Sequence, residues 1–264
     1  MIIFERQLLI MQIYRQISEI IRQNQEAVLC IITGTTGSSP RKAGSKMIVF
    51  PDKKITGTIG GGSIEFKAIA DALEVMQTGI PTQKTYQLEE DLAMHCGGTV
   101  ELFFDPIKSN PDLYIFGAGH IGRAVARYAR DFGFRVTLFD PREKIFDEFD
   151  QTAFTCINED YFAAIEKATF SKNTFCVIVT PKHQYDENIL IKLLRKPHAY
   201  LGMIGSPSKV AVACKNLIEK ESFTKQEINM VDMPIGIKFN AVTPEEIAIS
   251  ITAKLIDVKN DLNK

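Results

Sequence analysis

The stretch FGAGHIG, residues 116–122, decides how the second half of the chain folds. It spaces Gly117, Gly119 and Gly122 as G-x-G-x-x-G, after the apolar run LYIF and before a helical pattern. In that context the first glycine makes a tight turn, the second lets the backbone approach a pyrophosphate, and the third lets the helix pack on the strand. The sequence therefore predicts the first strand–helix unit of a nucleotide-binding sheet.

Strand and helix patterns alternate on both sides of this motif. Strands are expected at 113–116, 135–139, 152–157, 174–180 and 199–204, and helices at 120–130, 161–168, 187–195, 206–220 and from 243 onward. Such alternation is typical of a parallel sheet with helices on both faces. We expect an α/β chain in which an N-terminal mixed α/β domain, residues 1–107, precedes a Rossmann-like parallel-sheet domain, residues 112–264.

Several side chains around the glycine loop are candidates for binding a nucleotide. Asp140 ends the second expected strand, where a carboxylate can bind a ribose hydroxyl. Arg142 either accepts a 2′-phosphate or is simply solvated, and His120 either touches a phosphate or caps its own helix. The alternative for the whole motif is a tight turn in a sheet that holds no ligand.

The segment TPKHQYDENIL, residues 180–190, follows the fourth strand at the edge where such sheets bind ligands. His183 and Asp186 are either a general acid/base pair for a hydride substrate or the entry of a helix that Asp186 caps.

The stretch GTIGGGSIEF, residues 57–66, is the corresponding feature of the first domain. Consecutive backbone N–H groups can curl around an anion, and a helix expected at 63–77 adds its N-terminal dipole. The preceding SSPRKAGSK offers cations. The candidate anion-binding residues are Arg41, Lys42, Gly60, Gly61, Gly62 and Ser63. The alternative is two ordinary glycine turns, with Ser63 as the helix N-cap.

Cys96, in MHCGG (94–98), differs from the other four cysteines because it lies in a polar stretch beside His95. A thiolate there would suit a soft metal or sulfur chemistry, whereas the alternative is an inert thiol in a turn. The odd cysteine count and the lack of a CxxC pair indicate reduced thiols, and hence a cytoplasmic protein without a disulfide framework.

Composition excludes some classes of partner. The 264 residues carry a formal net charge of −1 and no tryptophan, so no overall field attracts nucleic acid or an anionic membrane. Charged residues interrupt the apolar N-terminus, which we expect to form an amphipathic helix and not a signal peptide or a membrane span.

Taken together, five blocks resemble the XdhC/CoxI family of xanthine dehydrogenase accessory factors. The blocks are GSSPRKAGSKMIVFPDKKITGTIGGGSIE, CGG, IFGAGHIGRAVARYARDFGFRVTLFDPR, YLGMIGS and PIG…TPEEIA, in the order of the family. The resemblance implies a protein that binds the molybdenum cofactor, supports its sulfuration with a sulfur-donating desulfurase, and inserts it into a molybdenum hydroxylase such as xanthine dehydrogenase. It carries site roles to Gly60, Gly61, Gly62, Glu65, Cys96, Gly117, Gly119, Gly122 and Asp140.

On this resemblance Cys96 faces the metal or relays sulfur, and the glycine turn of the first domain holds an anionic part of the cofactor. We expect a homodimeric maturation chaperone and not a catalyst. Two alternatives stay open: an NAD(P)-dependent oxidoreductase that uses His183, and a nucleotide-sensing module without chemistry.

Overall fold

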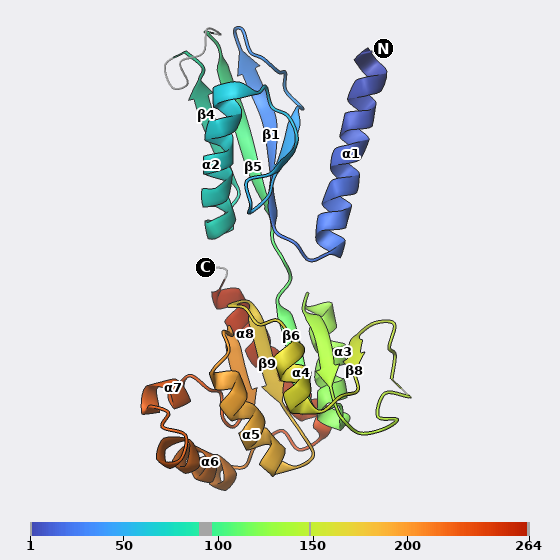
Figure 1. Cartoon of the computed structure of the whole chain (residues 1–264), viewed down its shortest axis with the longest axis vertical. Coiled ribbons are helices and arrows are strands. Elements are labelled where there is room, and N and C mark those ends of the chain that lie inside the picture. The colour runs from blue at the N-terminus through green and yellow to red at the C-terminus, as the bar shows by residue number, and fades with distance from the viewer. Residues whose placement is uncertain (1, 90–96, 148, 263–264) are drawn as a thin grey trace. The chain divides into compact units, whose positions relative to one another are not determined.

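The computed structural model describes residues 2–89, 97–147 and 149–262, and the chain divides into two compact units, Met1–Ser109 and Asn110–Lys264 (Figure 1). Within the described residues, no helix is both long enough and apolar enough to span a bilayer.

The first unit is built on a five-stranded antiparallel sheet with the strand order β3-β2-β1-β5-β4. Its strands are β1 (Ala27–Thr36), β2 (Lys46–Val49), β3 (Ile55–Gly57), β4 (Thr82–Gln87) and β5 (Thr99–Ile107). Strands β2 and β3 form an antiparallel hairpin, with Ile48 paired to Thr56. The loop at 37–45 leads from β1 into β2, and the turn at 58–61 follows β3.

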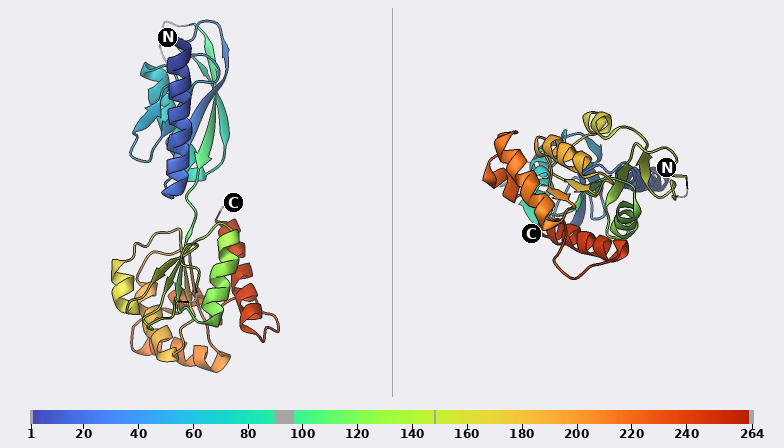
Figure 2. Two further views of the ribbon diagram at one scale, coloured as in Figure 1. Left: turned by 90° about the vertical axis from the view of Figure 1, so that its right-hand side faces the viewer. Right: turned by 90° about the horizontal axis from the view of Figure 1, so that it is seen from below.

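Two helices cover opposite faces of that sheet (Figures 1 and 2). Helix α2 (Gly62–Thr78) buries Ile64 and Ala68 on one face, and helix α1 (Ile2–Arg22) buries Ile13 and Ile20 on the other. Helix α2 ends where expected, at Gly79, whose left-handed backbone lets its N–H bond the Val75 carbonyl at 2.7 Å.

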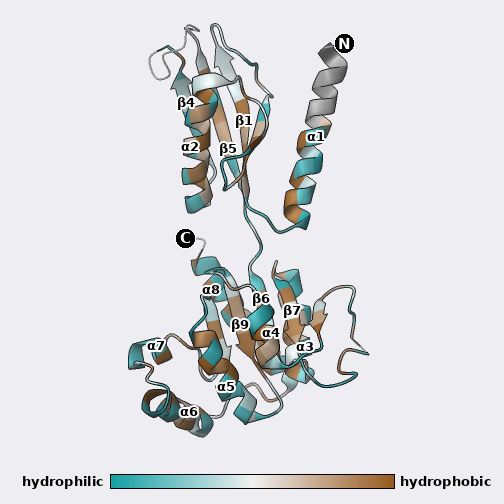
Figure 3. Ribbon diagram, in the orientation of Figure 1, coloured by the Kyte–Doolittle hydropathy of each residue, from teal (hydrophilic) through white to brown (hydrophobic). Residues whose placement is uncertain are grey.

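The second unit holds a five-stranded parallel sheet with the order β10-β9-β6-β7-β8. Its strands are β6 (Asp112–Phe116), β7 (Arg135–Phe139), β8 (Thr155–Ile157), β9 (Thr174–Ile178) and β10 (Tyr200–Met203). Every residue of β9 is buried, and Figure 3 shows this strand as hydrophobic. The chain adds strands on one side of β6 and then on the other, so a switch point lies between β6 and β9, where such sheets bind ligands.

Helices cover both faces of the parallel sheet, as Figure 2 shows. Helices α3 (His120–Asp131) and α8 (Pro244–Asp261) pack on one face, and α4 (Tyr161–Lys167), α5 (His183–Leu194), α6 (Pro207–Glu219) and α7 (Lys225–Asn229) on the other. The predicted fold class, a mixed α/β domain followed by a Rossmann-like parallel-sheet domain, is confirmed. Helix α7 was not expected from the sequence, although Thr224 and Glu227 form a capping box at its start.

Candidate functional site

The triple-glycine turn of the first unit is organised around the chain's own Glu65. Its Oε1 accepts hydrogen bonds from the amides of Ile59 at 3.0 Å and Gly61 at 2.9 Å. The Gly60 amide at 3.3 Å and the Thr58 hydroxyl also donate to this oxygen. All three glycines have positive φ, from 60° to 142°, which glycine adopts without a side-chain penalty. The amides of residues 59–61 therefore converge on one acceptor, which is a carboxylate of the chain itself.

Because Glu65 already binds the amides of this turn, the residues predicted to bind an external anion there have other roles. Partial burial raises the pKa of Glu65, but the bonds from Thr58, Gly61, Ile59 and Gly60 outweigh it, so the pKa lies below its usual value. Ser63 is not the N-cap of α2, because Gly61 occupies that position and no side chain caps the helix. The exposed groups at this helix start are Gly62 and Ser63.

Three blocks that are distant in sequence meet beside this turn. A Cβ atom on Gly60 would lie 2.6 Å from Pro40 Cγ, so the 37–45 loop packs directly on the glycines. A Cβ on Gly98 would lie 2.2 Å from the Ser38 carbonyl oxygen, and one on Gly37 would lie 3.2 Å from Gly98 Cα. The glycines of CGG therefore fit against the same loop, and a side chain at Gly98 would force the two backbones apart.

Two predicted residues of this block, Cys96 and His95, lie outside the described residues. The cations Arg41 and Lys42 follow Pro40 directly and are exposed. Within the described part of the chain, neither has a carboxylate at ion-pair distance, so both are available to an external anion.

Two of the described cysteines, Cys30 and Cys176, are buried in the two units' cores. Burial raises the pKa of Cys30 to about 12, with the negative charge of Asp71 adding to the effect, and burial also raises that of Cys176. Burial raises the pKa of Cys156 too. All four described cysteines are free. Because the thiolate is the reactive form, Cys30 and Cys176 are poor nucleophiles.

In the second unit the glycine loop joins β6 to α3 at the predicted position. A Cβ on Gly122 would lie 1.9 Å from the Gly117 carbonyl oxygen, and one on Gly117 would lie 2.4 Å from the Val179 carbonyl oxygen. Gly119 is the N-cap of α3. His120 is exposed and does not cap its helix, which removes that alternative.

Asp140 lies at the end of β7, but its carboxylate is directed into the protein. It has no exposed surface, and its oxygens accept bonds from Arg142 Nε at 2.8 Å, Arg142 Nη2 at 2.7 Å and the Ala118 amide at 2.8 Å. Burial raises the pKa of Asp140, but Arg142 and the amides of Ala118 and Arg142 hold it below its usual value. The group presented to solvent at this strand end is Arg142, whose side chain is 41% exposed.

Two buried polar residues have roles that the sequence did not reveal: Tyr161 was not singled out, and Asp186 does not have the capping role considered for it. Among the described residues the buried Tyr161 hydroxyl has no hydrogen-bond partner, and burial together with the Asp140 charge raises its pKa. Its apolar sequence context, YFAAIEKA, gave no signal. Asp186 does not cap α5; its carboxylate accepts bonds from the amide and hydroxyl of Thr180 and so fixes the end of β9. His183 opens α5, and its side chain lies outside the described atoms.

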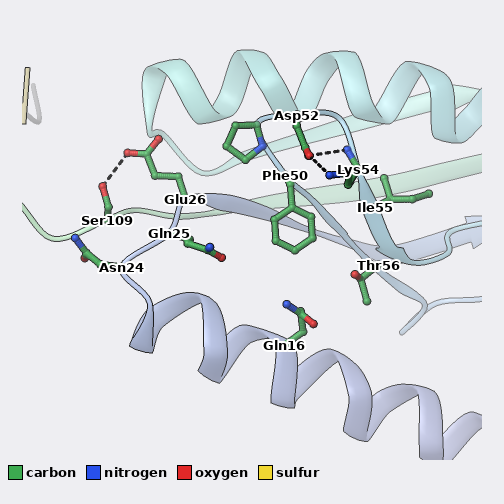
Figure 4. Close-up of a pocket in the computed structure, with 11 residues that line it drawn as sticks. Gln16, Asn24, Gln25, Glu26, Phe50, Asp52, Lys54, Ile55, Thr56 and Ser109 are labelled. Carbon is green, nitrogen blue, oxygen red and sulfur yellow. Dashed lines mark hydrogen bonds and ion pairs between the residues drawn. The ribbon is translucent and has the colours of Figure 1, made fainter. Parts of the chain in front are cut away.

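A cavity of about 690 Å³ that the sequence did not predict lies between α1 and the β2–β3 hairpin of the first unit (Figure 4). Gln16, Gln25, Phe50 and Thr56 line it, and the Asp52–Lys54 ion pair neutralises one rim. Glu26 also lines it, so this cavity carries an acidic group, whereas the loop at 37–45 carries the cations Arg41 and Lys42. Among the described residues no group of three or more His, Cys, Asp or Glu side chains is placed to hold a metal ion.

Two known protein families each match one part of this chain. The XdhC Rossmann domain matches residues 113–255, and the XdhC and CoxI family matches residues 20–87. The crystal structure of a xanthine dehydrogenase from Bacillus halodurans has the same fold, with a TM-score of 0.50, 22% identity and coverage of 94% of this chain and 95% of that chain.

Three curated proteins are similar in sequence. The chain is 32% identical to the protein YqeB of Escherichia coli K12, over 95% of its own length and 47% of that protein. It is 29% identical to a probable xanthine dehydrogenase subunit of Bacillus subtilis 168, over 62% of this chain and 48% of that one. It is also 29% identical to the molybdenum cofactor insertion chaperone PaoD of Escherichia coli K12, over 36% of this chain and 31% of that one. The chain thus spans about half the length, or less, of these relatives, and it belongs to the XdhC and CoxI family.

Proposed function

We propose that this chain is an accessory factor that binds the molybdenum cofactor, supports its sulfuration and inserts it into a molybdenum hydroxylase of the xanthine dehydrogenase type. Similarity to an insertion chaperone and to a probable component of xanthine dehydrogenase supports the accessory role. The observation that carries the proposal is the meeting of three blocks, in which Pro40 packs on Gly60 while Gly98 fits against Ser38.

The chemistry of this corner fits the anionic part of such a cofactor. The Gly60 and Gly61 amides already bind Glu65, so they serve to shape the turn. The groups that would hold a phosphate are the side chains of Arg41 and Lys42 and the uncapped first turn of α2. When bound, the cofactor would supply a molybdenum centre able to carry a sulfido ligand. Cys96 would contribute a soft ligand or carry the sulfur.

The test measures cofactor retention. Purified full-length chain is loaded anaerobically with molybdenum cofactor and desalted, and bound molybdenum is measured beside transfer to an apo-hydroxylase. We expect Arg41→Gln and Cys96→Ser to lose retention, while the matched controls Arg15→Gln and Cys214→Ser keep it. Equal retention by all four variants would overturn the proposed site.

An oxidoreductase using NAD(P) is less well supported by the geometry. Binding of a ribose diol by Asp140 would require breaking two short bonds to Arg142, because the carboxylate is fully engaged within the protein. This alternative predicts reduction of added NAD(P) by some small substrate, and that Cys96→Ser has no effect on it. A spectrophotometric assay of NAD(P)H absorbance distinguishes the two functions.

We further propose that the protein works as a cytoplasmic homodimer. Reduced thiols such as the buried Cys30 and Cys176 are typical of that compartment. A cofactor that must be kept from water is well sheltered at an interface. Light scattering of the purified chain tests the dimer directly, and a monomer at all concentrations would refute it.

A further inference from the structure

A second cavity, of about 650 Å³, lies within the Asn110–Lys264 unit at the carboxyl end of β10. Three separate segments line it: 204–207 after β10, 234–241 before α8, and Ile247 with Ser250 on α8 itself. Two of these segments belong to the sequence blocks YLGMIGS and PIG…TPEEIA, for which the proposed function has no use. The cavity opens at the edge of the sheet where folds of this class bind ligands.

Residues 234–237 line one side of this cavity, called here its floor, and hydrogen bonds tie them to Asp232 and to β10. The Asp232 carboxylate accepts hydrogen bonds from the Tyr200 hydroxyl at 2.6 Å and the Gly236 amide at 2.8 Å. The Met203 amide bonds the Asp232 carbonyl at 3.0 Å, and the Ile235 amide bonds the Met203 carbonyl at 3.0 Å. These bonds form an isolated parallel bridge between Gly202 and Asp232, beside β10.

Two glycines make that close packing possible. A Cβ on Gly202 would lie 2.5 Å from Ile235 Cγ1, and one on Gly236 would lie 2.4 Å from Ser250 Oγ. The Ser250 hydroxyl in turn donates to the Ile237 carbonyl at 2.7 Å, which ties the floor to α8. These contacts join the segments that line the cavity to β10 and to α8.

The mouth of the cavity combines exposed apolar side chains with positive charge. Ile237 and Phe239 are 44% and 45% exposed, and both line the cavity. Lys238 lies between them, and within the described residues no carboxylate lies at ion-pair distance from it. The first turn of α6, which starts at Pro207 on the rim, adds a partial positive charge.

From this geometry we propose that the cavity binds a compound with a planar ring and a negatively charged group. The ring would lie against Phe239 and the isoleucine walls, and its negative group would face Lys238 and the start of α6. A pterin and a nucleotide base share this chemistry. The inference does not rest on the proposed function, because a nucleotide sensor would use the same cavity.

The chain has no tryptophan, so a single introduced one is a unique fluorescent reporter. Phe239→Trp places it in the cavity, and Val242→Trp, at an 82% exposed position outside the lining, is the matched control. Each variant is titrated with pterin-6-carboxylate, with GMP and with inorganic phosphate. We expect saturable quenching of Trp fluorescence only in Phe239→Trp, by pterin-6-carboxylate or GMP at a Kd below about 1 mM, and none by phosphate. Which of the two binds more tightly identifies the source of the ring.

Adding Lys238→Gln to Phe239→Trp should raise that Kd about tenfold, the effect of losing one charge contact. Urea unfolding of both reporter variants verifies that each is folded. Equal quenching of both reporters, or no saturable quenching by either heterocycle, would overturn the proposal. Because cofactor retention is tested at Arg41 and Cys96 in the other unit, failure here is distinguishable from failure of the proposed function.

Discussion

The carboxylate of Glu65 lies 2.9 Å from the amide nitrogen of Gly61, so a residue in the first turn of α2 binds the turn that precedes it. One oxygen accepts four donors, and the triple-glycine motif gains its shape from inside the chain. Glu65 is therefore a positioning residue for the 58–61 turn, and an external anion has to bind elsewhere on this corner.

We expect Glu65→Ala to lower the free energy of unfolding by roughly 1–3 kcal/mol, because the amides of Ile59, Gly60 and Gly61 lose their partly buried acceptor. Glu65→Gln keeps an acceptor oxygen and should lose less. Urea denaturation measures both changes. Glu74→Ala on α2, which removes only an exposed ion pair with Lys84, is the control, and a Glu65→Ala midpoint equal to wild type would contradict this role.

The Asp140–Arg142 pair predicts a specific dependence of stability on acid. Because the native pKa of Asp140 lies below its unfolded value of about 3.9, its contribution is fully present above that pH and is lost as the pH falls below it. At pH 7 Asp140→Asn should lower the unfolding free energy by roughly 1–3 kcal/mol, since charged hydrogen bonds are lost. The difference from wild type should shrink between about pH 4 and pH 2.

Thermal unfolding at a series of pH values measures this difference. Among the described residues, the exposed Asp147 has no side-chain hydrogen bond or ion pair, so Asp147→Asn is a matched control that should follow wild type throughout. A constant gap between Asp140→Asn and wild type down to about pH 2 would show that the ionised pair is not what stabilises the native state.

Sequence patterns determine most of the fold here because the local signals agree with one another. The spacing of glycines at 117–122, the Gly79 stop of α2 and the Thr243–Glu246 capping box of α8 all appear where their backbone chemistry requires them. Helix α7 has its own capping box, Thr224 with Glu227, but its five residues are too short for a periodic pattern to reveal.

The sequence could not predict whether a polar side chain of the candidate site points into the protein or toward solvent. Asp140 and Glu65 stand at positions that suit ligand binding, yet both bind their own backbone. Nothing in a one-dimensional pattern distinguishes an outward carboxylate from an inward one. The Asp140 carboxylate points inward because it binds Arg142. The sequence does not reveal this pair, because an arginine two residues after a strand could equally bind a phosphate or remain solvated.

The glycine loop of the second unit permits a matched pair of substitutions. Gly122→Ala would place a Cβ 1.9 Å from the Gly117 carbonyl oxygen, so helix α3 must move away from β6. We expect a loss of about 1–3 kcal/mol or more in unfolding free energy. Gly119→Ala has an ordinary φ of −73° and no heavy atom nearer than 3.9 Å, so it should unfold like wild type. Equal losses in the two variants would contradict this account of the motif.

Thiol reactivity separates the predicted functional cysteine from the structural ones. Burial raises the pKa of Cys30 to about 12 and raises that of Cys176, so neither forms an appreciable thiolate at pH 7. With an aromatic disulfide reagent at neutral pH, we expect Cys96→Ser to remove the fastest-reacting thiol, while Cys214→Ser leaves it.

If Cys96 serves near Arg41 and Lys42 as proposed, the double variant Arg41→Gln/Lys42→Gln should slow the labelling of Cys96, because neighbouring cations favour the thiolate. If fast labelling survives Cys96→Ser, the reactive thiol is another cysteine, and the proposed role of Cys96 beside the glycine turn is wrong.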